Sequence, residues 1–217
     1  MPDILETVAP EASDRASRAP QQERGQRRVE QILDASEQVF AELGVDAATM
    51  QLIAERAESS MGSLYHFFPN KDAIVEALGA RYAEAVRRAN EEAMPLTLAH
   101  IELKDLFDRV LRAQMRLLEE LPAFNPVHQA VQRNCPEINA DMEQALVGHV
   151  GQFLALRYPR MPEDVRAASA LVSVVAVHAV VELAGRLPSA HRALAIREAH
   201  GMMVSHYAAH DARYGSV

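Results

Sequence analysis

Apolar residues recur at intervals of three and four along the chain, from Val29 to about His210. This is the spacing of one face of an α-helix, and no segment shows a convincing strand pattern. Gly44 and Pro188 interrupt the spacing, because neither residue type continues a helix well. The sequence therefore predicts an all-α fold of about nine helices. We expect them at residues 29–43, 49–57, 60–68, 70–92, 103–121, 124–131, 138–158, 165–186 and 191–210.

Charge and composition set broad limits on the partners. The net charge of −8 argues at face value against a nucleic-acid partner. Residues 15–28, however, contain five arginines and only one acidic residue, so a local contact with DNA stays open. The single cysteine, Cys135, excludes an internal disulfide and fits a reducing cytoplasm. No signal-peptide core is present, and the longest uncharged apolar run, residues 167–181, is 15 residues, short of the ~20 that span a bilayer. We expect a cytoplasmic protein with no membrane partner and no cofactor.

Two short helices follow the first long one and are joined by about three residues. Thr49 and Ser60 are plausible N-caps for them, and Asn70 would cap the longer helix that comes next. Two short helices braced by a longer one make a helix-turn-helix, whose second helix enters the DNA major groove. Gly62 and Ser63, near the start of that helix, would let the backbone approach DNA closely.

The aromatic cluster at the end of this helix divides into two faces. Leu64 and Phe68 should point inward and hold the short helix against its neighbours. Tyr65, His66 and Lys71 should reach phosphates, which fix the register of a protein on DNA without reading its sequence.

This region resembles the DNA-binding signature of the TetR/AcrR family of transcriptional repressors. The matching positions are Thr49, Ile53-Ala54, Ala57 and the run Gly62-x-Leu64-Tyr65-x-x-Phe68-Pro69-Asn70-Lys71-Asp72. The likeness covers roughly residues 24–82, and the helix count extends it in outline to the whole chain. Two positions depart from the family pattern: Glu58-Ser59 stands where Gly-Val is usual, and Phe67 stands where His or Tyr is common.

The resemblance implies specific DNA contacts. Phosphate contacts would come from Thr49, Tyr65 and Lys71, and groove contacts from residues of the two short helices. The full set of DNA-binding candidates is Thr49, Gln51, Ser60, Met61, Gly62, Ser63, Tyr65, His66 and Lys71. Two alternatives stay open: Tyr65 and His66 could instead pack locally, and Gln51, whose amide suits adenine recognition, could be an ordinary surface residue.

Four successive helices of the C-terminal part each carry one polar residue on an apolar stripe: Gln114, His128, His149 and His178. Taken singly, each is typical of a hydrogen-bonded core residue. Taken together, they suit an apolar cavity with a few convergent polar groups. Histidines from several helices could also hold zinc, although nothing in the spacing fixes their distances. The candidate effector-binding residues are Phe107, Leu111, Gln114, Phe124, His128, His149, Phe153 and His178.

The expected helix 165–186 is uncharged on every side between Arg166 and Glu182. A helix that is apolar all round must be covered all round, and a second subunit is the natural cover. The resemblance implies the same arrangement, a homodimer formed through helices of about residues 165–186 and 191–210. His178 could belong to that interface rather than to the cavity.

The domain organisation follows from these assignments. We expect a disordered tail at 1–23, a helix-turn-helix DNA-binding domain at 24–70, a helical effector-binding and dimerisation domain at 71–210, and a C-terminal tail at 211–217.

The predicted function is a DNA-binding regulator, and the family default is a repressor. It would leave a palindromic operator in double-stranded DNA when a small, largely apolar effector binds. One alternative is a small helical enzyme with a histidine-containing pocket. The sequence opposes it, because it contains no phosphate-binding Gly-rich loop, no HExxH motif and no nucleophile elbow. The other alternative is a DNA-binding dimer that has no effector.

Overall fold

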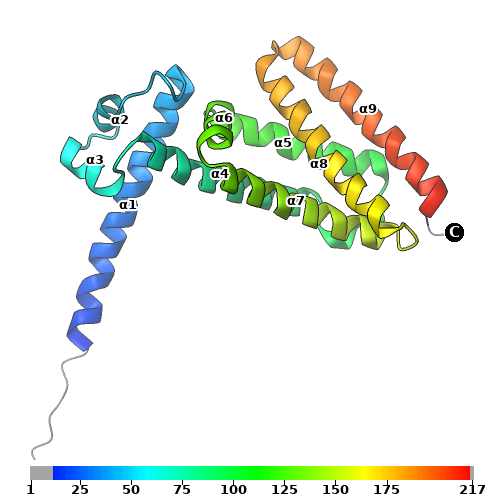
Figure 1. Ribbon diagram of the computed structural model, residues 1–217, viewed down its shortest axis with the longest axis horizontal. Helices are drawn as coiled ribbons and strands as arrows, with labels where there is room; N and C mark the ends of the chain where they lie inside the picture. The colour runs from blue at the N-terminus through cyan, green and yellow to red at the C-terminus, as the bar shows by residue number, and fades with distance from the viewer. Residues whose placement is uncertain (1–11, 216–217) are drawn as a thin grey trace, which may run out of the picture.

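The computed structural model describes the backbone of residues 12–215 and the side chains of residues 23–215. This part of the chain holds nine α-helices, one short 3-10 helix and no strand, which confirms the all-α prediction (Figure 1). The helices are α1 (Ala12–Leu43), α2 (Met50–Arg56), α3 (Met61–Phe67), α4 (Lys71–Ala93), α5 (Leu103–Glu120), α6 (Phe124–Asn134), α7 (Pro136–Arg157), α8 (Glu163–Arg186) and α9 (Ser189–Tyr214). The sequence did not predict the 3-10 helix, η1 (Leu96–Leu98).

Both expected tails are too long. Helix α1 begins at Ala12, so the predicted disorder of residues 1–23 is wrong for 12–23, and residues 1–11 lie outside the described range. Ala, Arg, Gln and Glu dominate 12–23, and such residues extend an existing helix without needing an apolar stripe. Helix α9 likewise runs to Tyr214 rather than ending near residue 210, because Asp211 in its last turn is bonded to Arg157.

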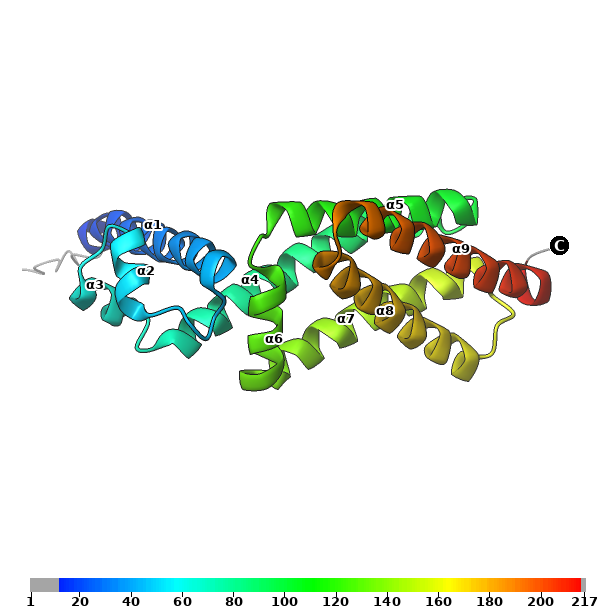
Figure 2. The ribbon, with the colours of Figure 1, turned by 90° about the horizontal axis from the view of Figure 1, so that it is seen from above.

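The helices form two regions joined by α4. Figure 1 shows α1, α2 and α3 at one end of the molecule and α5 to α9 at the other, with α4 running from one to the other. In Figure 2, α8 and α9 lie side by side along one face of the larger region. Helix α4 contacts α1 at one end and α5, α6 and α7 further along.

The core continues without a break from the small region into the large one. One cluster of buried residues includes Phe40 of α1, Leu64 of α3, Leu78 of α4 and Val127 of α6. The contact between α4 and α6 is close at Gly79, where a Cβ atom would lie 2.6 Å from a methyl group of Val131. The core thus crosses the domain boundary that we expected at residue 70.

Helix α8 leaves much apolar surface uncovered in this single chain. Its exposed apolar side chains are Leu171, Val172, Val175 and Leu183, and α9 adds Leu194 and Met202. Within the described residues, α8 alone is long and apolar enough to cross a membrane by length and composition; 28% of its most apolar window is buried. On its inner side, Ser173 bonds the Tyr207 hydroxyl at 2.6 Å, so α8 is tied to α9. The outward face needs a cover that this chain does not supply.

The turn between α2 and α3 holds a strained residue. Helix α2 ends in a Schellman motif, in which the N–H of Ser59 donates to the carbonyl of Ala54 at 2.9 Å and that of Glu58 donates to Glu55 at 3.2 Å. The motif requires a left-handed residue at its centre, and Glu58 has φ 47°. The family pattern has glycine at this position, and glycine adopts the left-handed conformation without strain. This chain makes the same turn with Glu58, which adopts that conformation only at a cost in energy.

We expect Glu58→Gly to raise the free energy of unfolding by about 0.5–1 kcal/mol, because glycine relieves the left-handed strain by more than it loosens the unfolded chain. Urea unfolding followed by circular dichroism measures the change. Glu119→Gly is the control: Glu119 is exposed within α5, so the same substitution should lower stability by about 0.5–1 kcal/mol. Equal destabilisation by both variants would show that the turn is not strained.

Candidate nucleic-acid interface and ligand cavity

The two short helices, seven residues each, are held by side-chain caps. The Thr49 hydroxyl accepts from the N–H of Leu52 at 3.2 Å, and the Ser60 hydroxyl accepts from the N–H of Ser63 at 3.1 Å. Asn70 caps α4 in the same way, at 2.8 Å. All three predicted caps are therefore present. Helices this short are marginal alone, so the caps and the buried core beneath them fix the geometry of the unit.

Helix α3 has a buried face and an open face. Leu64 is fully buried and Phe68 nearly so, as predicted. The open face carries Met61, Tyr65 and His66, and the Tyr65 side chain is 49% exposed. The His66 ring is exposed too, with one edge-to-face contact to the neighbouring Phe67. Local packing therefore leaves the surface of both side chains largely free for a partner.

Gly62 lies on the same open face. A Cβ atom built at this position meets no other atom within 4 Å. Packing within the chain therefore gives no reason for glycine here, although glycine weakens a helix. A close approach by something outside the chain would require it.

The remaining DNA-binding candidates are at the surface. Thr49, Gln51 and Ser60 are exposed, and Ser63 is half-buried. The Gln51 amide donates to Glu55 one turn further along α2, at 3.1 Å. An exposed position of this kind fits both predicted roles of Gln51, the base contact and the ordinary surface side chain.

Lys71 requires a correction. Its ammonium group donates to the backbone carbonyls of Val45 at 2.6 Å, Asp46 at 3.1 Å and Ala48 at 2.9 Å. An ammonium group has three N–H donors, so all three are used inside the protein. Lys71 thus pins the loop between α1 and α2 to the first turn of α4, and it is not an open phosphate ligand. Sequence spacing identified an important lysine but not the atoms that it contacts.

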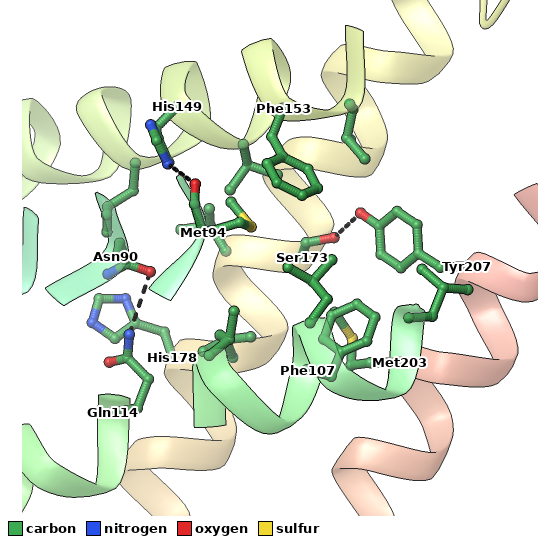
Figure 3. Close-up of a pocket in the computed structure, with 18 of the residues that line it drawn as sticks. Asn90, Met94, Phe107, Gln114, His149, Phe153, Ser173, His178, Met203 and Tyr207 are labelled. Atoms are coloured by element: carbon green, nitrogen blue, oxygen red, sulfur yellow. Dashed lines mark hydrogen bonds between the residues drawn. The ribbon is translucent and has the colours of Figure 1, made fainter. Parts of the chain in front are cut away.

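A cavity of about 70 Å³ lies in the larger region, among α4, α5, α7, α8 and α9. Five of the eight predicted effector-binding residues line it: Phe107, Gln114, His149, Phe153 and His178 (Figure 3). The rest of the wall is mostly Val, Leu and Met. Pockets that hold drug-sized ligands are several times larger, so such a ligand would have to push the walls apart.

The polar groups of the wall bond to one another across helices. Gln114 donates to Asn90 at 3.4 Å, joining α5 to α4, and Ser173 bonds Tyr207, joining α8 to α9. His149 contacts the carbonyl of Met94 at 2.9 Å, at the end of α4. If Gln114 is a hydrogen-bonded core residue, it needs a buried polar partner. That partner is Asn90, at the long end of hydrogen-bond distance.

Sequence reasoning missed several residues of the wall. Asn90, Ser173, Met203 and Tyr207 all line the cavity but were not predicted. Asn90 could have been found, because it continues the four-residue spacing of the buried stripe of α4. The spacing of Tyr207 gave no comparable signal.

Three predicted effector-binding residues lie elsewhere. Leu111 faces a groove between α5 and α9, and Phe124 and His128 lie on the α4–α6 side, where the Phe124 ring stacks between those of Tyr82 and His128. An apolar stripe shows that a residue is buried, but not which neighbour covers it.

The histidines do not assemble a metal site. His128 and His178 have ring centroids 5.0 Å apart, and among the described residues no group of three His, Cys, Asp or Glu side chains could hold a metal ion. Burial lowers the pKa of both rings, which favours their neutral forms. Burial also raises the pKa of the Cys135 thiol, which opposes a redox role.

Two family models match this chain. One, described as bacterial regulatory proteins of the tetR family, matches residues 32–78, which span the helix-turn-helix. The other, described as a Tetracyclin repressor-like C-terminal domain, matches residues 102–206, which include most of the cavity wall. This chain belongs to the TetR family of transcriptional regulators.

Curated TetR-family relatives match parts of the chain. The transcriptional repressor KstR of Mycolicibacterium smegmatis is 29% identical over 140 residues, which are 63% of this chain and 64% of KstR. YhgD of Bacillus subtilis, an uncharacterized transcriptional regulator, is 31% identical over 98 residues, 45% of this chain and 46% of YhgD. The chain thus spans less than two thirds of the length of these two relatives.

Solved structures of TetR-family proteins match more of the chain. A regulator from Streptomyces coelicolor is 26% identical with a TM-score of 0.58, covering 83% of this chain and 98% of that one. SmeT, the Stenotrophomonas maltophilia repressor solved with triclosan, has a TM-score of 0.63 at 19% identity, covering 82% and 90%. At that identity the likeness to SmeT shows the fold alone.

Membership in the TetR family decides the broad class of the protein. Its members are DNA-binding transcriptional regulators with an N-terminal helix-turn-helix, and they are typically dimers that bind small molecules. The family and the curated relatives of this chain are transcriptional regulators, not enzymes.

We expect Lys71→Met to lower the free energy of unfolding by about 1–3 kcal/mol, because three carbonyl groups lose their donor. Urea unfolding measures this loss. Lys104→Met is the matched control, since Lys104 is exposed and should tolerate the change.

DNA binding provides the second measurement for this pair. If Lys71 is internal, the slope of log affinity against log salt stays unchanged in Lys71→Met. A slope smaller by about one would mean that Lys71 also neutralises a phosphate, contrary to this assignment.

Proposed function

We propose that this protein binds a palindromic operator as a homodimer and leaves it when a small, largely apolar effector enters the cavity. The observation that carries the proposal is the position of α4. Its first half shares a core with the helix-turn-helix, and its second half supplies Val86, Asn90 and Met94 to the cavity wall. A ligand that moves this wall therefore acts on the helix that supports α3.

The open face of α3 supports the DNA-binding part of the proposal. Gly62 has free space around it, and Tyr65 and His66 present polar groups beside it. Gly25 of α1 lies against Phe67, so the basic segment Arg24–Arg28 of α1 is next to α3. This concentrates positive charge at the interface of a protein whose net charge is −8.

The uncovered face of α8 supports the dimer. Exposed apolar side chains such as Val172 and Val175 would be buried against the same helices of a second copy. Burial of this kind stabilises association by about 25 cal/mol per Å² of apolar surface, before the costs of association are subtracted. A two-fold dimer places two α3 helices in major grooves about one turn of DNA apart, or a multiple of it, and this spacing requires a palindrome.

The described helices suggest how the roles are divided. Residues 24–70 would bind DNA, and residues 71–210 would bind the effector and form the dimer, with α4 belonging to both units. A regulator that acts on chromosomal DNA works in the cytoplasm, which is where we place it.

The link from the cavity to α3 has two parallel paths. Along α4, the wall residues lie on the helix that begins beside α3. Through α6, the His128 ring lies against the ring of the wall residue His178, with centroids 5.0 Å apart, and Asn134 donates to Asp72 in the first turn of α4 at 3.0 Å. Val131 of α6 also packs against Gly79. An effector releases DNA only by binding the displaced arrangement better than the DNA-bound one, and a hundredfold preference is worth about 2.7 kcal/mol.

We expect Gly62→Ala to weaken operator binding by about tenfold or more, the size of a lost base contact, because its methyl group meets DNA and nothing else. Its thermal stability should be equal or higher, since alanine favours a helix. Gly148→Ala in α7 is the control, because that position is also helical, exposed and unobstructed.

Fluorescence anisotropy on an operator recovered from bound genomic fragments measures both affinities. Normal operator affinity of Gly62→Ala would refute the proposed orientation of α3.

We expect Gln114→Leu to give a folded dimer that binds the operator but no longer releases it with the effector, and that melts at the same or a higher temperature. The reason is that the Gln114–Asn90 bond is long, so the effector takes over the Gln114 amide as its partner. Operator binding with and without an effector identified by thermal-shift screening measures release.

Gln132→Leu is the matched control, because Gln132 contacts His128 outside the cavity. A Gln114→Leu protein that melts earlier, yet releases DNA normally, would make Gln114 a structural residue paired to Asn90.

A further inference from the structure

Arg157 is the only permanently charged residue in the cavity wall. Its side chain is 10% exposed, so its charge has left water almost completely. A buried cation of this kind is often a binding site for an anionic ligand, because it needs a counter-charge. Whether it attracts a ligand here depends on what already surrounds it.

The guanidinium group of Arg157 is fully engaged within the protein. Nη1 donates to the carbonyls of Ala99 at 3.0 Å and Ile101 at 2.7 Å. Nη2 donates to both carboxylate oxygens of Asp211 at 3.1 Å, and Nε reaches Asp211 and the Tyr158 hydroxyl. Every nitrogen has an acceptor, and Asp211 cancels the charge. The cavity therefore has a buried cation but no free positive site.

The other polar groups of the wall carry no permanent charge. They are the amides of Asn90 and Gln114, the hydroxyls of Ser173 and Tyr207, and the rings of His149 and His178. Burial raises the pKa of Tyr207 and lowers that of His178, so both keep their neutral forms near pH 7. These groups can hydrogen-bond a ligand, and none of them is a permanent cation that would neutralise an anion.

The polar groups gather at two places in the cavity. Figure 3 shows the Asn90–Gln114 pair beside His178 on one side and the Ser173–Tyr207 pair on the other. The apolar wall, including Phe107, borders both. This arrangement suits a hydrocarbon body that carries a hydrogen-bonding group at one end or at both.

We propose that the cavity selects an uncharged ligand, such as an alcohol, ketone, ester or amide on a hydrocarbon body, and that Asp211 sets this preference by occupying Arg157. The inference rests on the proposed role of the cavity as the effector site. A carboxylate that entered would lose its hydration without gaining a cation, which is unfavourable in an apolar site. Asp211 is thus a positioning residue, which acts on the ligand through Arg157.

Paired probes test this preference on the full-length protein. 1-Octanol and octanoate have the same hydrocarbon chain and differ in charge at about pH 7.5. Isothermal titration should show octanol binding at least about tenfold more tightly than octanoate, the size of one charge-assisted hydrogen bond. In Asp211→Asn, Arg157 loses its counter-charge, so the ratio should shift toward octanoate by about tenfold or more.

A matched control separates this local effect from net charge. Asp141→Asn removes one negative charge from an exposed position on α7, the helix that carries Arg157, and should leave the ratio at the wild-type value. Purely structural damage in Asp211→Asn would weaken both probes and leave their ratio unchanged. The side chain of Asp211 is 40% exposed, which favours a folded variant; if it did not fold, the wild-type ratio alone would decide.

The outcomes distinguish this inference from the proposed function. Three results would overturn the inference. Octanoate could bind the wild type as tightly as octanol does, the ratio of the two affinities could stay unchanged in Asp211→Asn, or neither probe could bind. Val177→Phe, which fills the cavity from α8, tests the site itself and should weaken octanol binding. If Val177→Phe left octanol binding and effector-driven DNA release unchanged, the cavity would not be the effector site and the proposed function would fail.

Discussion

The packing of α4 is the constraint on which the rest of the structure depends. A 23-residue helix is buried first against α1, then against α6, and finally forms part of the cavity wall. Close-packed interiors transmit displacement because they have little free volume to absorb it. At Gly79 the approach of Val131 leaves no room for a side chain, so α4 and α6 cannot slide independently. The helix-turn-helix is therefore an extension of the core of the larger region rather than a separate module.

The cavity combines low polarity with hydrogen bonds between several of its own polar groups. Among the described residues, no buried side-chain nitrogen or oxygen atom lacks a hydrogen-bond partner. A ligand that bonds to one of these paired groups must therefore replace an existing bond, such as Gln114 to Asn90. Because replacement yields little net hydrogen-bond energy, apolar burial would drive binding and the polar pairs would select the ligand. The small volume of the cavity means that such burial also displaces the walls, and α4 is one of them.

The two halves of the molecule handle exposed surface differently. The helix-turn-helix accepts local strain at Glu58, in the turn between α2 and α3, and a glycine at Gly62 on α3, while the caps and the core keep the unit rigid. Helix α8 keeps an apolar outward face while its serines bond inward to α9. Both surfaces are incomplete in a single chain, and a second copy and DNA are the partners that would complete them.

The sequence by itself determined the helices, their order and the family. Periodicity located the nine helices of the described chain, and local chemistry fixed the caps at Thr49, Ser60 and Asn70, since a cap depends on residues within a few positions of one another. It also separated the buried Leu64 from the exposed Tyr65 on α3.

Only the tertiary structure decided which neighbour each buried residue meets. It placed Phe124 and His128 outside the cavity and brought in Asn90, Ser173 and Tyr207. It also turned Lys71 inward, and it joined Arg157 to Asp211 across 54 residues. Helical spacing records that a side chain is covered, but the identity of its cover depends on how distant helices cross, and no local pattern encodes that.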